Sequence, residues 1–222
     1  MKSYIIKENK NNLRSKKRFY KDKYLLELIN IITKYKGTFK IHNFVRDLLY
    51  VKSLEEYDAI LTKYLIIHNE HPTIILQIYG LFTNWSPFET YNMGQLKGNY
   101  LELLSYSYMR QKYSQKIYEE SNIILDNYQS HTWDLILELN EKLYLYECKF
   151  SAKILKRKHI DQMTGLKNRI PTSSLFLVIY DTNEIIKFNL KQLRKNTGKD
   201  KYDKIIHQIN FITIENFTSN PF

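Results

Sequence analysis

The chain has 222 residues, of which 43% are hydrophobic, so it is long enough to bury the core of one domain or of two small ones. Lys and Arg outnumber Asp and Glu by 34 to 23, and the resulting net charge of +11 favours polyanionic partners, chiefly nucleic acid, with an anionic membrane surface as the alternative. No apolar run is long enough to cross a bilayer, no signal peptide is evident, and the single cysteine excludes an internal disulfide, so we expect a cytoplasmic protein.

The first 23 residues carry nine Lys or Arg against two acids and show no apolar periodicity. This composition fits either a nucleic-acid-binding arm or a solvated terminus. Apolar residues then recur at helical spacing from Tyr24 to a stop at Gly37, and further helices are predicted over residues 41–50 and 54–68. These helices predict a small bundle or dimerisation unit, or alternatively a DNA-binding helix-turn-helix.

Turn residues around Pro87 mark a boundary between a first domain, residues 1–90, and a second domain, residues 91–222. In the second domain a basic segment over residues 152–169 is followed by an apolar run of strand length at Ser173–Asp181. A strand, a helix and a further strand indicate a crossover that covers one face of a sheet. We therefore predict an α/β, or α+β, domain with a mixed β-sheet.

The stretch from Thr132 to Phe150 has two runs of alternating residues on either side of Asn140-Glu141, which predicts a β-hairpin. With these two residues as the loop, Asp134 lies opposite Glu147. A four-residue loop gives the same pairing, whereas a three-residue loop would put the two acids on opposite faces. Opposed like charges destabilise a sheet unless they are compensated, so the register predicts a divalent-cation site.

Lys149 shares the face of Glu147 and lies diagonal to Asp134, so it adds a positive charge beside the predicted cation. The alternative is an exposed sheet face with an ordinary ion pair. Cys148 alternates with both neighbours and points to the opposite face, which favours a core position over a role as a nucleophile.

The order of these residues resembles the PD-(D/E)xK, or restriction-endonuclease-like, nucleases, over about residues 96–180. Asp134 matches the first acid of the family motif, although Trp133 stands where proline is usual, and Glu147-Cys148-Lys149 matches the second element. The helix that precedes the hairpin carries Glu102 and the one that follows carries Gln162, as in many members. The local sequence is most similar to nuclease domains of CRISPR-associated ancillary effectors and of archaeal Holliday-junction resolvases.

This resemblance implies a restriction-endonuclease-like core that hydrolyses phosphodiester bonds with Mg²⁺ or Mn²⁺. The implied metal ligands are Glu102, Asp134, Glu147 and the backbone carbonyl of Cys148. The implied catalytic residues are Glu102, Asp134, Glu147, Lys149 and Gln162.

A positive face beside such a site suits a phosphate backbone, although a solvated helix face has the same composition. The candidate nucleic-acid-binding residues are Lys153, Lys156, Arg157, Lys158, Lys167 and Arg169. We predict a DNA endonuclease, a homodimer if it cuts both strands. The alternatives are a catalytically silent nucleic-acid-binding protein with this fold, or an RNase of the CRISPR-associated ancillary type.

Overall fold

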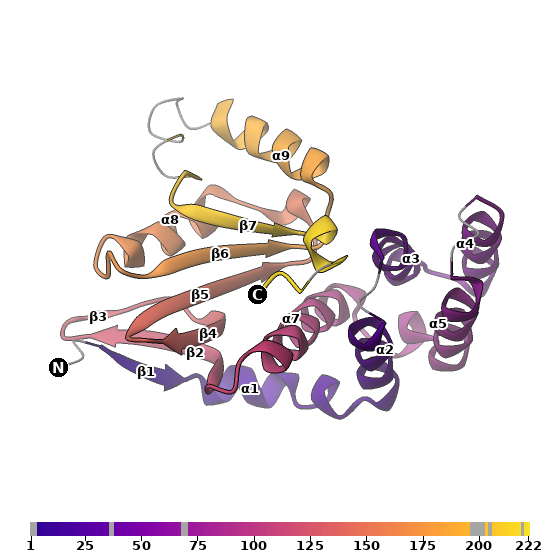
Figure 1. Cartoon of the computed structure of the whole chain (residues 1–222), viewed down its shortest axis with the longest axis horizontal. Helices are drawn as coiled ribbons and strands as arrows, with labels where there is room; N and C mark the ends of the chain where they lie inside the picture. Colours follow the sequence, from indigo (N-terminus) through magenta and orange to yellow (C-terminus); the bar gives the residue numbers. More distant parts are fainter. Residues whose placement is uncertain (1–3, 36–37, 68–70, 196–202, 204–205, 219) are drawn as a thin grey trace.

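A mixed seven-stranded β-sheet flanked by helices forms the centre of the computed structural model, which describes residues 4–35, 38–67, 71–195, 203, 206–218 and 220–222 (Figure 1). The strands are β1 Ile5–Glu8, β2 Ile117–Leu125, β3 Tyr128–Gln129, β4 Trp133–Leu139, β5 Lys142–Lys149, β6 Ser174–Ile179 and β7 Ile209–Thr213. Their order is β1-β2-β4-β5-β6-β7, with β3 paired to β2. The pairs from β1 to β5 are antiparallel and those from β5 to β7 are parallel, so the predicted α/β (α+β) class with a mixed sheet is confirmed.

Helices account for most of the remaining described chain. The α-helices are α1 Lys10–Lys16, α2 Lys23–Lys34, α3 Phe39–Tyr50, α4 Leu54–Ile67, α5 Pro72–Trp85, α6 Pro87–Thr90, α7 Met93–Lys112, α8 Arg157–Lys167 and α9 Asn183–Lys195. Short 3-10 helices lie at Phe19–Lys21 (η1), Ala152–Ile154 (η2) and Ile214–Thr218 (η3). Among the described residues no helix combines the length and the apolar character that a membrane crossing requires.

The predicted hairpin is β4 and β5, and its loop is Asn140-Glu141 as expected. Both loop residues have positive φ, 49° and 61°, which is the backbone of the tight turn that suits the twist of two antiparallel strands. The ladder pairs Leu139 with Lys142, and the same register continues to Leu135 opposite Tyr146. One step further along this register, Asp134 comes opposite Glu147.

Alternation along the strands gives the sheet two apolar faces, each covered by its own helices. On one face Leu135, Tyr146 and other side chains pack in a single cluster with helices α2 to α5 and α7. On the other face Ile136 and Leu177 pack against residues of α8 such as Met163. The prediction that Cys148 points away from Glu147 is confirmed, since its Sγ lies 3.9 Å from the hydroxyl of Ser105 on α7.

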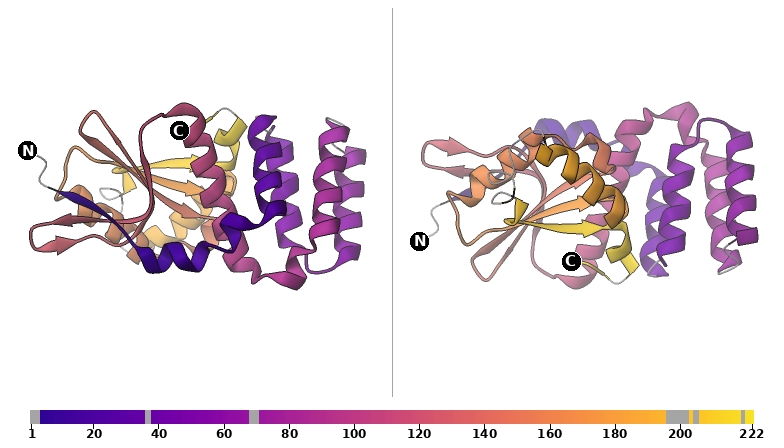
Figure 2. Two further views of the ribbon diagram at one scale, coloured as in Figure 1. Left: turned by 90° about the horizontal axis from the view of Figure 1, so that it is seen from below. Right: turned by 90° about the horizontal axis from the view of Figure 1, so that it is seen from above.

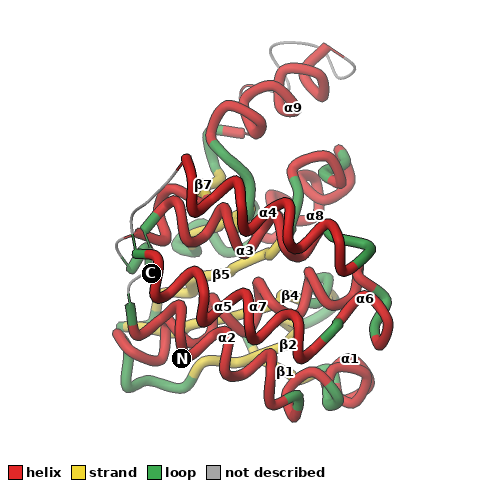
Figure 3. Tube along the Cα trace, turned by 90° about the vertical axis from the view of Figure 1, so that its right-hand side faces the viewer, coloured by secondary structure: helices red, strands yellow, loops and turns green. Residues whose placement is uncertain are grey.

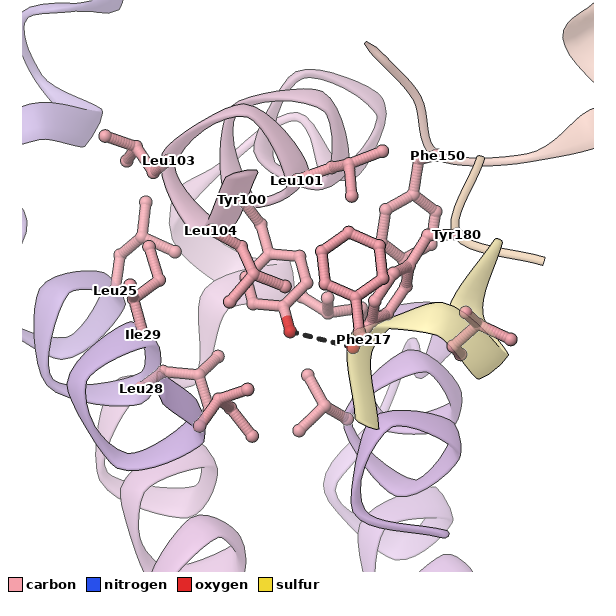
Figure 4. Close-up of a cluster of buried hydrophobic side chains, with 14 of the residues drawn as sticks. Leu25, Leu28, Ile29, Tyr100, Leu101, Leu103, Leu104, Phe150, Tyr180 and Phe217 are labelled. Carbon is pink, nitrogen blue, oxygen red and sulfur yellow. Dashed lines mark hydrogen bonds between the residues drawn. The ribbon is translucent and has the colours of Figure 1, made fainter. Parts of the chain in front are cut away.

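The predicted N-terminal helices are present as α2, α3 and α4, followed by α5, and they lie at the end of the sheet toward which β5, β6 and β7 run (Figures 2 and 3). Figure 4 shows side chains of α2, including Leu25 and Leu28, facing those of α7, including Leu104. The first 23 residues also supply β1, which pairs with β2. The division near residue 90 stays a prediction, but both the hydrophobic core and the sheet cross it.

Candidate active site

The hairpin register brings Asp134, at the start of β4, together with Glu147 and Lys149, at the end of β5. The carboxylate Oδ2 of Asp134 accepts a hydrogen bond of 2.6 Å from the backbone N–H of Cys148. The Nζ of Lys149 lies 2.5 Å from Oε1 of Glu147 and donates to the Cys148 carbonyl at 3.2 Å. All four groups therefore belong to one small polar cluster, which we call the carboxylate site.

Helix α7 brings Glu102 to this site, as the resemblance implied. Oxygen atoms of Glu102, Glu120 and Asp134 lie within 4.8 Å of one another, an arrangement that can hold a metal ion. The side chain of Glu102 is 11% exposed and that of Glu120 is 4% exposed, so both acids are largely withdrawn from water.

Glu120 was not among the residues singled out in the sequence. The β2–β4 ladder pairs Glu119 with Leu135 and Ser121 with Trp133, which places Glu120 across from Asp134. Its φ of 43° is unusual for a residue with a side chain, and the β2–β4 ladder has no pair at this residue although β2 itself continues through it. The available signal was the pair Glu119-Glu120 within an otherwise strand-like stretch.

Two further side chains contact the carboxylate site. Lys16, the last residue of α1, places its Nζ against both Glu102 and Glu120. The Nε2 of His131 lies 3.4 Å from Oε2 of Glu147, and its ring packs on that of Trp133 with centroids 4.3 Å apart. Neither residue was predicted, because each lies far in sequence from its partner or outside the strand pattern.

Burial dominates the electrostatics of the site. It raises the pKa of Glu102 to about 7, even though Lys16 acts in the opposite direction. It also raises the pKa of Asp134 well above its ordinary value, and the neighbouring Glu147 adds to this rise. Burial works against the charged form of Glu147 as well, but contact with His131 and Lys149 holds its pKa below the usual range. The carboxylates are thus crowded and short of positive charge.

The donor set fits a hard divalent cation. Four carboxylates face two lysine ammonium groups, which leaves two negative charges uncompensated when all are ionised. Apart from the Nε2 of His131 at 3.4 Å, the buried Oε2 of Glu147 has no hydrogen-bond partner among the described residues. Carboxylate and carbonyl oxygens are the ligands that Mg²⁺ and Mn²⁺ prefer, so the cluster of Glu102, Glu120 and Asp134 is suitable to hold such an ion. Glu147 and the Cys148 carbonyl stay predicted ligands.

A cleft of about 580 Å³ leads to this site. Gly94, Gly98 and Glu102 of α7 form one wall, with Gly98 and Glu102 a turn apart. A Cβ added at Gly98 would come no closer than 4.0 Å to any atom outside its immediate neighbours, the nearest being Oε1 of Glu102. The missing side chains therefore leave Glu102 reachable from the cleft.

The opposite wall of the cleft is basic. Three of the six candidate nucleic-acid-binding residues line it: Lys153, Lys156 and Lys158. The other three have partners elsewhere. Arg157 pairs with Asp161 at 2.7 Å, Lys167 donates to the carbonyl of Pro171 at 2.7 Å, and the guanidinium of Arg169 lies 4.2 Å from the ring centre of Tyr128.

Gln162 lies on the exposed side of α8 and is not among the residues that line the cleft. The residues of α8 that do line it are Lys158 and His159, about one turn earlier, and the Nδ1 of His159 accepts a hydrogen bond of 3.1 Å from the backbone N–H of Lys156. The role implied for Gln162 stays a prediction.

No family model and no curated protein matches the chain. Among solved structures, Can2 from Sulfobacillus thermosulfidooxidans in complex with cyclic tetra-adenylate aligns with 90% of this chain and 53% of its own, at 16% identity and a TM-score of 0.43. Protein VC1899 from Vibrio cholerae aligns with 99% of this chain and 57% of its own, at 12% identity and a TM-score of 0.48. The chain thus spans just over half the length of each, and its function has to be argued from the site residues.

Proposed function

We propose that the protein is a divalent-metal-dependent nuclease of the PD-(D/E)xK type, with DNA as its substrate. The observation that carries this proposal is the convergence of Asp134, Glu147 and Lys149 at the end of one hairpin, beside a cleft walled by lysines. Outside such a site, a buried glutamate and a half-buried aspartate would rarely be placed in opposed positions on neighbouring strands.

A bound Mg²⁺ or Mn²⁺ would lower the pKa of a coordinated water and neutralise charge that develops on the scissile phosphate. Asp134, Glu147 and the Cys148 carbonyl would hold this ion. Lys149, already within 3.2 Å of that carbonyl, would orient the attacking water and stabilise the phosphate oxygens. The water oxygen would form the new bond to phosphorus as the bond to the leaving oxygen breaks; the water would lose one proton to solvent and the leaving oxygen would take one up.

The cleft lysines would bind phosphates on either side of the scissile bond. Contacts of this kind do not read sequence, so they predict affinity that falls steeply with salt. They suit RNA as well as DNA, and the similarity of the sequence to nuclease domains of CRISPR-associated ancillary effectors makes RNA the second candidate substrate. Cutting of both strands of a duplex would favour a homodimer, because one site cuts one strand.

The principal rival is a protein that binds nucleic acid without cutting it. It is tested by incubating supercoiled plasmid, linear duplex, single-stranded DNA and RNA with Mg²⁺, Mn²⁺ or EDTA. Lys149→Ala is the test variant, and Lys142→Ala, an exposed lysine on the same strand, is the matched control. We expect metal-dependent cleavage by the wild type and by the control, and a loss of at least about 100-fold in Lys149→Ala. Binding without cleavage in every protein would establish the rival.

A further inference from the structure

Lys16 is the cation of the site that the nuclease resemblance does not account for. Its ammonium group contacts Glu102 on α7 and Glu120 on β2, so a residue near the start of the chain bridges two acids that lie far from it in sequence. Its side chain is only 15% exposed. A lysine withdrawn from water in this way needs opposite charges around it, and the two carboxylates supply them.

The N-terminal arm holds Lys16 at this position through several contacts with Glu120. Strand β1 pairs with β2 in a register that sets Glu8 opposite Ser121. The backbone N–H of Asn9 donates to the carbonyl of Glu120 at 2.7 Å, and the side-chain amide of Asn12 donates to its Oε2 at 2.7 Å. Asn9 also caps α1 by accepting from the N–H of Asn12 at 3.2 Å.

These residues share one side of α1. Asn9, Asn12 and Lys16 are spaced by three and four residues, so they face the same direction on a helix. The side chains of Asn12 and Lys16 both contact Glu120 from this side, so the lysine is placed by the fold of the arm rather than by a chance approach of a flexible chain.

The position that Lys16 occupies is one that a cation would otherwise take. Oxygen atoms of Glu102, Glu120 and Asp134 lie within 4.8 Å of one another, close enough to share one ion. Many phosphodiester-cleaving sites place two divalent ions about 3.5–4 Å apart. Here Asp134 would contribute to one ion with Glu147, and a second ion on Glu102 and Glu120 would have to displace the ammonium group of Lys16.

We propose that Lys16 is a built-in cation that stands where a second divalent ion would bind, so that each chain takes up a single Mg²⁺ or Mn²⁺. This inference rests on the proposed function. With Lys16 in place the site lacks two positive charges, the number that one divalent ion supplies. Without it the site lacks three, and Glu102, Glu120 and Asp134 become free to hold another ion. Lys16 is thus a positioning residue that acts through these acids.

The test is the number and the coupling of bound Mn²⁺ ions, measured by equilibrium dialysis and by electron paramagnetic resonance on the full chain. The wild type is expected to bind one ion, with the hyperfine-resolved signal of isolated Mn²⁺. Lys16→Met keeps the apolar stem and removes the charge, so it is expected to bind two ions with the broadened signal of a coupled pair. Lys16→Met combined with Glu120→Gln is expected to return to one ion.

Lys17→Met, at the exposed neighbouring residue, is the matched control and should bind one ion like the wild type. Two ions in the wild type, or one ion in folded Lys16→Met, would overturn the inference. If Lys16→Met does not fold, the test uses the wild type and the charge-retaining Lys16→Arg. A coupled pair of Mn²⁺ ions in either protein would contradict the inference. Absence of any bound Mn²⁺ and of cleavage removes the proposed function itself, whereas one-ion binding with cleavage in both wild type and Lys16→Met removes only the role of Lys16.

Discussion

The hydroxyl of Tyr180, directly after β6, lies 2.7 Å from Nδ1 of His42 on α3, in a fully buried position. The same hydroxyl lies 3.0 Å from that of Tyr100 on α7. Tyr180 therefore joins two helices to the end of the sheet (Figure 4). The next residue, Asp181, accepts hydrogen bonds from the Ala152 backbone at 2.7 Å and from the Ser151 hydroxyl at 3.0 Å, just past Lys149. Helices α3 and α7 are thus connected, through Tyr180 and Asp181, to the segment that directly follows Lys149.

Burial lowers the pKa of His42 from 6.5 to about 4. Between pH 6.5 and about 4, His42 binds a proton in the unfolded chain but not in the folded chain. The free energy of unfolding should therefore fall as the pH drops through this range, by up to about 3 kcal/mol from this group. Urea unfolding at several pH values measures this slope. His42→Gln should flatten it, and His71→Asn, at an exposed histidine, should not. Parallel pH profiles for wild type and His42→Gln would contradict the assignment.

Asp134→Asn should separate stability from activity. The substitution keeps an acceptor for the Cys148 N–H and removes one charge from a crowded buried cluster. We expect the free energy of unfolding in EDTA to rise by about 1–2 kcal/mol, because burial and Glu147 already disfavour the charged form, while cleavage falls at least about 100-fold. Asp126→Asn, at an exposed turn, is the control and should change neither quantity. A lower free energy of unfolding in Asp134→Asn would contradict the argument, because it would mean that the charge of Asp134 is already compensated in the folded protein without a metal ion.

The cleft lysines should account for most of the salt-dependent binding. Replacing Lys153, Lys156 and Lys158 together by Gln should weaken duplex binding in EDTA and lower the slope of log affinity against log salt by up to about 3. The matched variant replaces Arg157, Lys167 and Arg169, which have protein partners, and should change the slope much less. Fluorescence anisotropy over a salt series gives both slopes. The reverse ranking would place the nucleic acid on the other side of α8.

Gly98 should control access to the site rather than metal binding. Gly98→Leu would place a side chain in the cleft next to Glu102, so KM for nucleic acid should rise while Mn²⁺ binding stays unchanged. Gly98→Ala should instead raise the free energy of unfolding by about 0.5–1 kcal/mol, because alanine is favoured in a helix. Gly80→Leu on α5, where an added Cβ meets no atom within 4 Å, is the control for adding a large residue to a helix. An unchanged KM in Gly98→Leu would show that substrate enters by another path.

The sequence by itself determined the parts of this protein that depend on neighbours along the chain. Alternating residues on either side of Asn140-Glu141 were enough to predict the β4–β5 register, because a two-residue turn sets which residues pair and a period of two sets which face they share. The same reasoning placed Asp134 opposite Glu147. Helical spacing identified α2, α3 and α4 without any knowledge of their packing, whereas α7 and its Glu102 came from the resemblance to the nuclease family.

Only the tertiary structure decided the rest of the site. Glu120 joins it because β2 pairs with β4 across β3 and a loop, a register that no tight turn dictates. Lys16 joins the site because β1 pairs with β2 at the edge of the sheet, and this pairing places the following helix α1 next to Glu102 and Glu120. Local periodicity gives the face on which a side chain lies but not which distant face meets it. Charge burial then favours particular contacts, because four carboxylates that are shielded from water need positive charges beside them. The fold brings those charges from distant parts of the sequence.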